Sequence, residues 1–397
     1  MTFPIQRIGG GQCYVASKAR CLEKNGWRVI VISPGSPNSP RQCWIDSLNQ
    51  YKPYLIHEVG YPLFCLPSFW INKVINKMIR MVGDVSEEDK IIIESHNDVT
   101  SFWGELLASR IKAQHFFFAL NESYRGKNKY YENKMDFFLF KYNRKEILCY
   151  YQTANRLFEG YRSFEENDIE GAWLNEEPVQ DVKNEQIDHF FDADYTICYI
   201  GRANKPYVDN IISSVGEFAK LCPEKRIQFV TVGNFSSLKR ALQGIRKENA
   251  NLIVLELGPL HPLPRSLFKK VDVVIAGSGS ARCSVEEGVL TILADPDTQQ
   301  SAGLLGYDTY ESVFQRNNEK YISFKDALIE ALIKKDFQHK PFFYKKTYSV
   351  EECVEQNFKL MEKAVNPLVY FDENKLCAGR ISLWIVFKIV VRKVLSR

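Results

Sequence analysis

The first half of the chain alternates short, almost wholly apolar runs with longer segments in which apolar residues recur at helical spacing. The apolar runs predict strands at residues 28–33, 90–94, 115–120 and 147–152. The segments between them predict helices at residues 12–25, 68–82 and 103–111. Runs this apolar are typical of strands that helices cover on both faces, so the pattern predicts a mainly parallel sheet.

The second half of the chain repeats this alternation. Its apolar runs predict strands at residues 195–200, 227–232, 252–257, 271–276 and 289–294. Its amphipathic segments predict helices at residues 208–221, 236–248 and 324–334. A last helix is expected at residues 349–364, because Ser349 and Glu352 have the spacing of a capping box at a helix start.

The segment between the two series, residues 165–188, is acidic and polar and contains Pro178, which is typical of a hinge between domains. We therefore predict an α/β protein of two doubly wound Rossmann-like domains that face a central cleft. The expected domains are residues 1–175 and residues 176–365, with the last helix a candidate to cross back to the first domain. A basic, apolar tail follows at residues 366–397.

Charge and cysteine content narrow the function classes. The 397 residues include 52 Lys and Arg against 48 Asp and Glu, so a nucleic-acid partner is not indicated. The 10 cysteines form no CxxC pair and no Cys/His group with zinc spacing, which argues against a metal site and fits reduced thiols. The start lacks the pattern of a secretory leader, and no apolar run reaches the roughly 18 residues of a membrane span. A cytoplasmic protein is expected.

Two segments of small residues stand where a strand meets a helix. Gly9, Gly10 and Gly11 precede the helix at residues 12–25, and a Gly-Ser-Gly-Ser-Ala segment follows the strand at residues 271–276. Glycine lets a ligand approach the backbone, and a helix start offers free N–H groups to an anion. The candidates for binding a phosphate are Gly10, Gly11, Ser278, Gly279, Ser280 and Ala281. An ordinary connecting loop remains the alternative for the first segment.

The second segment is not a dinucleotide-binding fingerprint. That motif requires a third glycine where Cys283 stands, and a full helix before the next strand. Only residues 282–287 separate the segment from Gly288, which is too short for the roughly 30-residue unit. A nicotinamide or flavin enzyme is therefore not indicated.

Basic residues follow the strand at residues 195–200. Arg202 and Lys205 lie where ligands bind in open α/β sheets, at the carboxyl ends of strands. A guanidinium and an ammonium at that position suit a diphosphate, although a solvated basic loop is the alternative. Gly233, which follows the strand at residues 227–232, is a further candidate for contact with the same ligand.

Three candidates for acid–base or metal chemistry also follow strands. His96 comes after the strand at residues 90–94 and is a candidate general base, with Glu94 or Asp98 to orient it. Glu122 follows the next strand and is a second candidate base, whereas a structural histidine is the alternative for His96. Asp295-Pro296-Asp297 has the carboxylates for a divalent cation but is typical of a turn, which we favour.

The tail carries a different pattern. Residues 379–397 combine Trp384, Phe387 and many aliphatic residues with five basic residues, over a length too short to span a bilayer. Peripheral contact with an anionic membrane on the inner face of the cell membrane is one interpretation. A terminal helix packed on the protein body is the other.

The two strand–helix series, the glycine segment and the Gly201-Arg202…Lys205 segment after a strand resemble GT-B-fold glycosyltransferases. The most similar group is the retaining, glycosyltransferase-family-4-like group of bacterial cell-surface polysaccharide synthesis. The resemblance covers roughly residues 5–365 and is clearest at residues 195–232 and 271–295. It implies that a sugar moves from a nucleotide-diphosphate sugar to a glycan or lipid-linked acceptor, without a metal or a resident cofactor. It also implies that Arg202 and Lys205 bind the diphosphate and that His96 contacts the donor sugar.

The chain departs from that family in two respects. The spacing of three residues between Arg202 and Lys205 is shorter than the family's usual spacing. The family has paired glutamates seven residues apart, and Cys283 stands where the second is expected, with Glu286 and Glu287 out of register. Two alternatives to a glycosyltransferase therefore stay open. One is a catalytically degenerate nucleotide-sugar or glycan-binding module, and the other is a nucleotide-sugar 2-epimerase.

Overall fold

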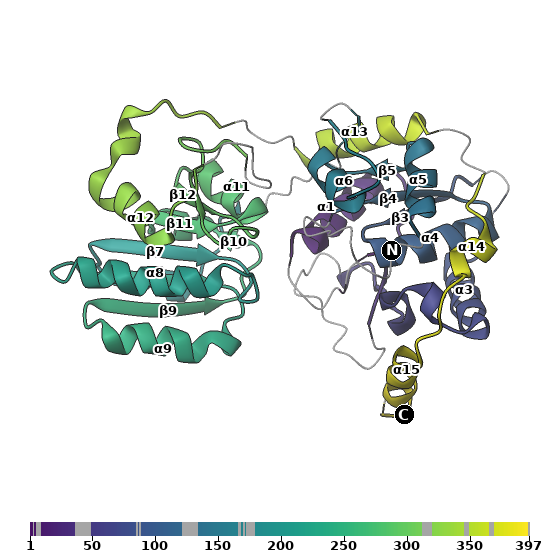
Figure 1. Cartoon of the computed structure of the whole chain (residues 1–397), viewed down its shortest axis with the longest axis horizontal. Helices are drawn as coiled ribbons and strands as arrows, with labels where there is room; N and C mark the ends of the chain where they lie inside the picture. The colour runs from purple at the N-terminus through teal and green to yellow at the C-terminus, as the bar shows by residue number, and fades with distance from the viewer. Residues whose placement is uncertain are drawn as a thin grey trace. The chain divides into compact units, whose positions relative to one another are not determined.

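The computed structural model describes the chain in segments. They are residues 1–2, 4, 9–35, 49–84, 86, 89–120, 134–165, 168–169, 171, 179–311, 320–344, 349–364 and 369–395. The chain divides into two compact units (Figure 1). Unit 1 comprises Met1–Glu176 together with Tyr348–Arg397, and unit 2 comprises Glu177–Thr347. The helix expected at residues 349–364 and the tail thus both belong to the unit that holds the start of the chain.

Unit 1 is built on short parallel strands. β1 (Ile32–Ser33) pairs with β2 (Tyr54–Leu55), and β3 (Ile92–Ser95), β4 (Gln114–Phe118) and β5 (Ile147–Leu148) pair in sequence order. The first residues of the chain join these two sheets, because Thr2 N–H donates to Ile32 O at 2.9 Å and His96 N–H donates to Met1 O at 3.2 Å. With this segment counted as the first strand, the order across the sheet is 3-2-1-4-5-6, the Rossmann order.

Helices of unit 1 cover this sheet. They are α1 (Gly10–Lys24), α3 (Ser68–Val82), α4 (Asp98–Ile111), α5 (Met135–Asn143), α6 (Tyr151–Leu157), α13 (Val350–Glu362), α14 (Glu373–Cys377) and α15 (Leu383–Leu395), with short 3-10 helices η1 (His57–Gly60) and η2 (Leu63–Cys65). The capping box expected at the start of α13 is present, since Glu352 N–H donates to Ser349 Oγ and Ser349 N–H donates to Glu352 Oε2. α13 packs on α1, the first helix of the unit.

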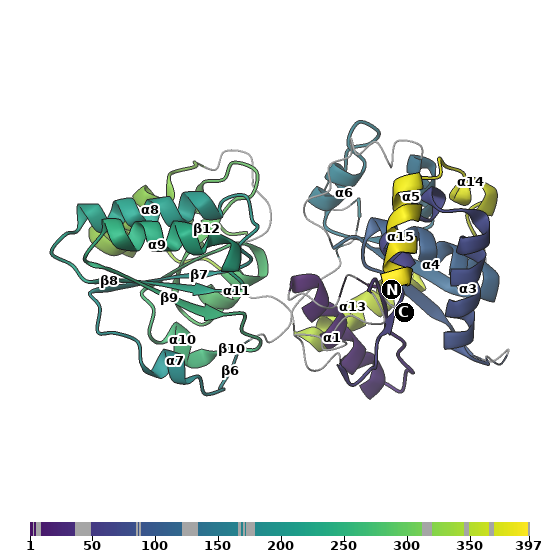
Figure 2. The ribbon, with the colours of Figure 1, turned by 90° about the horizontal axis from the view of Figure 1, so that it is seen from below.

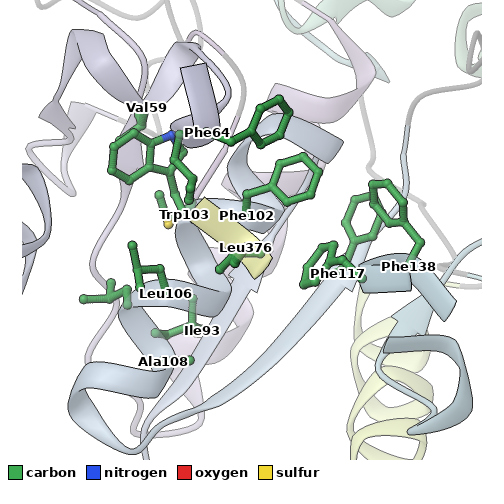
Figure 3. Packing of buried hydrophobic residues seen from close by; sticks show 14 of the residues in the cluster. Val59, Phe64, Ile93, Phe102, Trp103, Leu106, Ala108, Phe117, Phe138 and Leu376 are labelled. Carbon is green, nitrogen blue, oxygen red and sulfur yellow. The ribbon is translucent and has the colours of Figure 1, made fainter. Parts of the chain in front are cut away.

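The core of unit 1 is rich in aromatic side chains. Trp103 is fully buried, and its indole N–H donates to Tyr61 O at 2.8 Å. Figure 3 shows Phe102, Trp103 and Leu106 of α4 together with Leu376 of α14, which is 0% exposed. The tail therefore supplies a core residue to a unit whose sheet is formed more than 200 residues earlier in the chain.

Unit 2 holds a six-stranded sheet. Its order is β13-β12-β11-β7-β8-β9, with every pair parallel except β12 and β13. The strands are β7 (Tyr195–Ile200), β8 (Ile227–Val232), β9 (Leu252–Gly258), β11 (Val273–Ala276), β12 (Leu290–Ala294) and β13 (Ser301–Leu304). A separate parallel pair joins β6 (Val179–Gln180) to β10 (Leu263–Pro264). The central strands are buried on both faces, as their unbroken apolar runs predict.

Helices lie on both faces of the unit 2 sheet (Figure 2). They are α7 (Glu185–Asp188), α8 (Val208–Leu221), α9 (Lys239–Glu248), α10 (Arg265–Phe268), α11 (Ser278–Glu286) and α12 (Phe324–Leu328), with the short helices η4 (Ser236–Leu238), η5 (Ile329–Lys334) and η6 (Asp336–His339). Alternate residues of β7 serve the two faces: Ile197 and Tyr199 pack with α8, whereas Cys198 and Ile200 pack with α10 and α11 residues. The chain therefore has the doubly wound α/β class that the sequence predicts.

Candidate functional site

The sheet of unit 2 has a topological switch point between β7 and β11. These strands pair in parallel, with Ile200 opposite Ala276, yet the chain runs from β7 to β8 on one side and from β11 to β12 on the other. The segments that leave the two carboxyl ends therefore diverge, and a crevice for a ligand forms between them in folds of this kind. Arg202 and Lys205 follow β7, and residues 278–281 follow β11, so both sets of candidates lie at the switch point.

Two tyrosines hold the segments after β7 and β11 together. Tyr199 Oη donates to Arg202 O at 3.1 Å, and its side chain also hydrogen-bonds to Tyr207. Tyr207 in turn contacts the segment after β11, because a Cβ atom on Gly277 would lie only 3.0 Å from Tyr207 Oη. Burial raises the pKa of Tyr199, so its hydroxyl keeps its proton and remains a donor.

Gly233, which follows β8, lies against Gly201, which follows β7. A Cβ atom at this position would lie 2.1 Å from Gly201 O, and the backbone has φ +146°, which favours glycine. The N–H of Gly201 donates to Val232 O, and the N–H of Gly233 donates to Gly258 O. Gly233 thus fixes the backbone just before Arg202, and its role is to let two strand ends approach closely.

The expected loop at residues 278–281 is wrong in one respect, because these residues already form the first turn of α11. Glycine and serine have low helix propensity, but the first turn needs few helical hydrogen bonds, and buried Ala281 anchors it. The cap residue Gly277 supplies no side-chain hydrogen bond, and the first turn holds no acidic residue. The start of α11 therefore presents the positive end of a helix dipole, which favours an anion.

The two basic candidates differ in exposure. The side chain of Arg202 is exposed, and that of Lys205 is half-buried. Both lie on the connection from β7 to α8, on the same edge of unit 2 as the start of α11. The structure thus brings Arg202, Lys205, Gly233 and residues 278–281 to one edge of one sheet.

The interpretation of Asp295-Pro296-Asp297 as a turn is confirmed. Asp295 Oδ1 accepts hydrogen bonds from the N–H groups of Asp297 and Thr298 and from Thr298 Oγ1. These three donors engage that oxygen in a local turn. Within the described segments, no group of three or more His, Cys, Asp or Glu residues is arranged to hold a metal ion.

The second candidate site lies in unit 1, at the end of β3. His96 is 5% exposed and follows Glu94, and Nε2 of His96 lies 3.5 Å from Glu94 Oε2. Glu94 Oε1 also pairs with buried Lys18 Nζ at 2.7 Å, and Tyr14 packs edge-on against the His96 ring at 5.5 Å. Lys18 and Tyr14 come from one face of α1, where positions four apart are neighbours.

Burial sets the protonation of this cluster. It lowers the pKa of His96 to about 4, against the opposing effect of the Glu94 carboxylate, so the ring is neutral at pH 7. Burial alone raises the pKa of Glu94, but Lys18 and His96 outweigh it and bring that pKa down to about 2. Burial also lowers the pKa of Lys18. Among the described residues, neither ring nitrogen of His96 has a hydrogen-bond partner of good geometry.

A cavity of about 130 Å³ adjoins this cluster. It is lined by Lys18, Glu94 and His96 and by apolar residues that include Trp27 and Phe358. Pockets for cofactors and drug-sized ligands usually measure about 300–1,000 Å³. The cavity is therefore large enough for a few water molecules or a small group, but not for a whole nucleotide sugar.

The remaining candidates of unit 1 have mixed outcomes. Gly10 and Gly11 do not form a loop before the helix, because α1 already begins at Gly10 with Gly9 as its cap. Glu122 lies outside the described residues. Sequence reasoning missed Tyr14 and Lys18 beside His96, and Tyr199 and Tyr207 in unit 2. Tyr14 and Lys18 could have been found from their spacing of four residues, which places them on one face of a helix. Tyr207 could have been found from its position at the start of the helix that follows Lys205.

No protein-family model and no curated protein sequence matches the chain. Among solved structures, it is similar to a UDP-N-acetylglucosamine 2-epimerase from Listeria monocytogenes described as putative, with a TM-score of 0.53 and 14% identity over 90% of this chain and 93% of that one. It is also similar to a glycosyltransferase from Rickettsia africae (TM-score 0.51, 16% identity, 90% and 94% coverage). A third likeness is to Anabaena HepE in complex with UDP and glucose (TM-score 0.50, 10% identity, 100% and 99% coverage).

The chain has a GT-B-type fold. Both units contribute to this conclusion, since the alignments extend over nine-tenths or more of the chain and each unit has the 3-2-1-4-5-6 strand order of a Rossmann-like domain. Membership of glycosyltransferase family 4 stays a prediction from the sequence.

Proposed function

We propose that the chain is a glycosyltransferase that binds a nucleoside-diphosphate sugar on unit 2 and passes the sugar to a glycan or lipid-linked acceptor, as in bacterial surface polysaccharide synthesis. The observation that carries the proposal is the switch point of unit 2. There the exposed side chain of Arg202 and the start of α11 follow neighbouring strands, Tyr199 donates to Arg202 O, and Tyr207 lies against Gly277. Of the similar structures, one contains UDP and glucose.

In the proposed reaction, the main role of unit 2 is to stabilise negative charge. When the sugar leaves, negative charge builds up on the departing diphosphate, and donors fixed in place stabilise it without rearrangement. The fork of Arg202 suits two phosphate oxygens, Lys205 adds a point charge, and the N-terminus of α11 adds the positive end of a helix dipole. The proposal assigns no resident metal or cofactor, and the nucleotide sugar is a substrate.

His96 fits a binding role better than a proton-transfer role. Its pKa of about 4 leaves it neutral at pH 7, and it is then a weak base for an acceptor hydroxyl. A neutral imidazole whose Nε2 faces Glu94 can instead hydrogen-bond a sugar hydroxyl through Nδ1, which has no partner of good geometry among the described residues. Glu94, fixed as a carboxylate by Lys18, orients the ring. We therefore propose that His96 binds a sugar hydroxyl rather than transferring a proton.

The test is Arg202→Ala compared with Arg240→Ala, a second exposed arginine of unit 2 that lies on α9. Calorimetry with UDP should show binding at least about tenfold weaker for R202A and unchanged for R240A. Transfer from UDP-sugars should fall by about a hundredfold or more in R202A alone. Equal UDP affinity in the two variants would refute the placement of the diphosphate, and a panel of ADP, GDP and TDP extends the assay to other bases.

The similarity to the Listeria protein favours a second candidate, epimerisation at C2 of a UDP-sugar. The two reactions separate without any acceptor present. If UDP-N-acetylglucosamine alone is converted to its C2 epimer, as followed by proton NMR, the epimerase interpretation is correct. Binding of UDP with neither epimerisation nor transfer identifies a binding module, for which the missing glutamate at Cys283 gives a reason.

A further inference from the structure

The last helix of the chain, α15, is fixed to unit 1 by one face. Ile389 is 0% exposed, and Ile385 packs against the same core. The N–H of Ser382 donates to Cys65 O at 3.0 Å, just ahead of the helix. Gly379 lies so close to Phe64 that a Cβ atom there would be 2.5 Å from Phe64 O. The tail is therefore docked, and its other face has a defined direction.

The segment before α15 strengthens this attachment. Leu376 is 0% exposed in the unit 1 core, and Lys134 Nζ donates to the carbonyl oxygens of Lys375 at 2.6 Å and Leu376 at 3.1 Å. The N–H of Phe371 donates to buried Glu105 Oε1 at 2.8 Å. The segment that leads into α15 is thus held on unit 1 by core packing and by hydrogen bonds.

The outer face of α15 is apolar and exposed. Leu383 is 80% exposed, Trp384 60% and Phe387 65%, and Ile381 and Val390 are also exposed. In Figure 2, which views unit 1 from below, α15 lies in front of the rest of that unit. Single exposed apolar residues are ordinary, but five within ten residues, four of them on α15 and Ile381 just ahead of it, indicate an interaction surface.

The charge of the same segment selects the partner. Residues 378–397 contain Arg380, Lys388, Arg392, Lys393 and Arg397 and no acidic residue. Nζ of Lys388 lies 3.1 Å from the centre of the Trp384 ring, so a cation stands directly beside the apolar patch. Apolar side chains bordered by one sign of charge suit a surface that is both apolar and anionic.

We propose that the exposed face of α15 docks unit 1 on an anionic lipid bilayer, with the helix lying along the interface. Its 13 residues extend about 20 Å, short of the roughly 30 Å hydrocarbon layer, and no helix in the described parts of the chain is long and apolar enough to cross a membrane. Trp384 suits the headgroup level, where tryptophan is enriched. A second copy of the chain is disfavoured, because like charges would meet in a twofold contact.

The experiment measures co-sedimentation of the full chain with vesicles, and it is independent of the proposed enzyme activity. Vesicles of neutral phosphatidylcholine are compared with vesicles that contain one-third phosphatidylglycerol. The chain should bind the anionic vesicles and release on addition of salt. Trp384→Ser with Phe387→Ser should weaken this binding by about tenfold or more, and Lys388→Glu by about tenfold.

Matched controls come from unit 2. Phe191 and Phe343 are 58% and 61% exposed, and Phe191→Ser with Phe343→Ser should leave vesicle binding unchanged, as should Lys183→Glu. Circular dichroism shows that each variant is folded. The proposal is overturned if the chain ignores anionic vesicles, if it binds neutral and anionic vesicles equally, or if sedimentation velocity reveals a dimer that W384S/F387S abolishes.

Discussion

Gly233→Ala tests whether the backbone approach at the switch point matters. The added Cβ atom would start 2.1 Å from Gly201 O, and Cβ atoms in proteins essentially never come closer than 3.0 Å, so the two strand ends must separate by about 0.9 Å. The φ of +146° adds backbone strain for alanine. Together these effects should lower the stability of unit 2 by about 2 kcal/mol. A shift of about 1 Å at Gly201 moves Arg202 and should reduce sugar transfer by about a hundredfold.

Two other glycines of unit 2 serve as controls. Gly244 lies on α9, and no atom lies within 4 Å of the place where its Cβ atom would stand, so Gly244→Ala should stabilise the helix by about 0.5–1 kcal/mol. Gly258 has φ +72°, and no atom lies within 4 Å of the place where its Cβ atom would stand. Gly258→Ala therefore measures the cost of backbone strain without a steric clash. The variants at Gly233 and Gly244 should therefore shift stability in opposite directions.

The distribution of tryptophan separates the two units in the assay. All 6 tryptophans lie in the sequence ranges of unit 1, so tryptophan fluorescence follows unit 1 alone, whereas circular dichroism follows both units. In urea, G233A should lower the unfolding midpoint of unit 2, which circular dichroism detects. The unfolding midpoint of unit 1, which tryptophan fluorescence reports, should stay unchanged. UDP affinity is measured in parallel by calorimetry. Unchanged stability together with unchanged UDP binding in G233A would refute the close approach of Gly233 and Gly201.

The remaining predictions concern unit 1 and use tryptophan fluorescence in urea. Burial lowers the pKa of His96 and of His115 from 6.5 to about 4, so the unfolded chain takes up protons that the folded chain does not as the pH falls through this range. Stability should be full above about pH 6.5 and should drop by about 2 kcal/mol per histidine between pH 7.5 and 5; a flat profile contradicts the burial of both rings as neutral groups. Glu105→Gln should cost about 3 kcal/mol, because Glu105 is 1% exposed and accepts from Lys141 Nζ at 2.7 Å and His115 Nδ1 at 2.8 Å. Glu355→Gln, which removes an exposed pair with Lys359 on α13 of the same unit, should cost under about 1 kcal/mol, and equal losses in the two variants would rule out a special role for burial.

Much of the architecture follows from local sequence pattern. The strands at Tyr195–Ile200 and Ile227–Val232 and the helices at Ser68–Val82 and Val208–Leu221 have the predicted bounds. In the strands an apolar run, and in the helices a period of about 3.6 residues, extends over the whole element, and the neighbouring residues break it. The capping box at Ser349 was predictable for the same reason, since its two side chains act within one turn.

Other features depend on packing that the pattern does not carry. The apolar run at residues 147–152 reads as one strand, but β5 ends at Leu148 and α6 begins at Tyr151, because a short apolar run does not distinguish a buried strand from a buried helix. Similarly, the run at residues 28–33 pairs only at Ile32–Ser33. Lys18 of α1 pairs with Glu94 of β3, and a lysine is not predicted to be buried from its residue type.

The path of the chain has a consequence for its synthesis. Unit 2 is encoded between the two parts of unit 1, so it is complete as soon as residue 347 leaves the ribosome. Unit 1 at that moment still lacks Leu376 and Ile389, which fill its interior, and the N–H of Phe371, which satisfies Glu105. The middle of the chain can thus mature first, while the earlier part of unit 1 waits, with apolar surface open to chaperones, for residues 348–397.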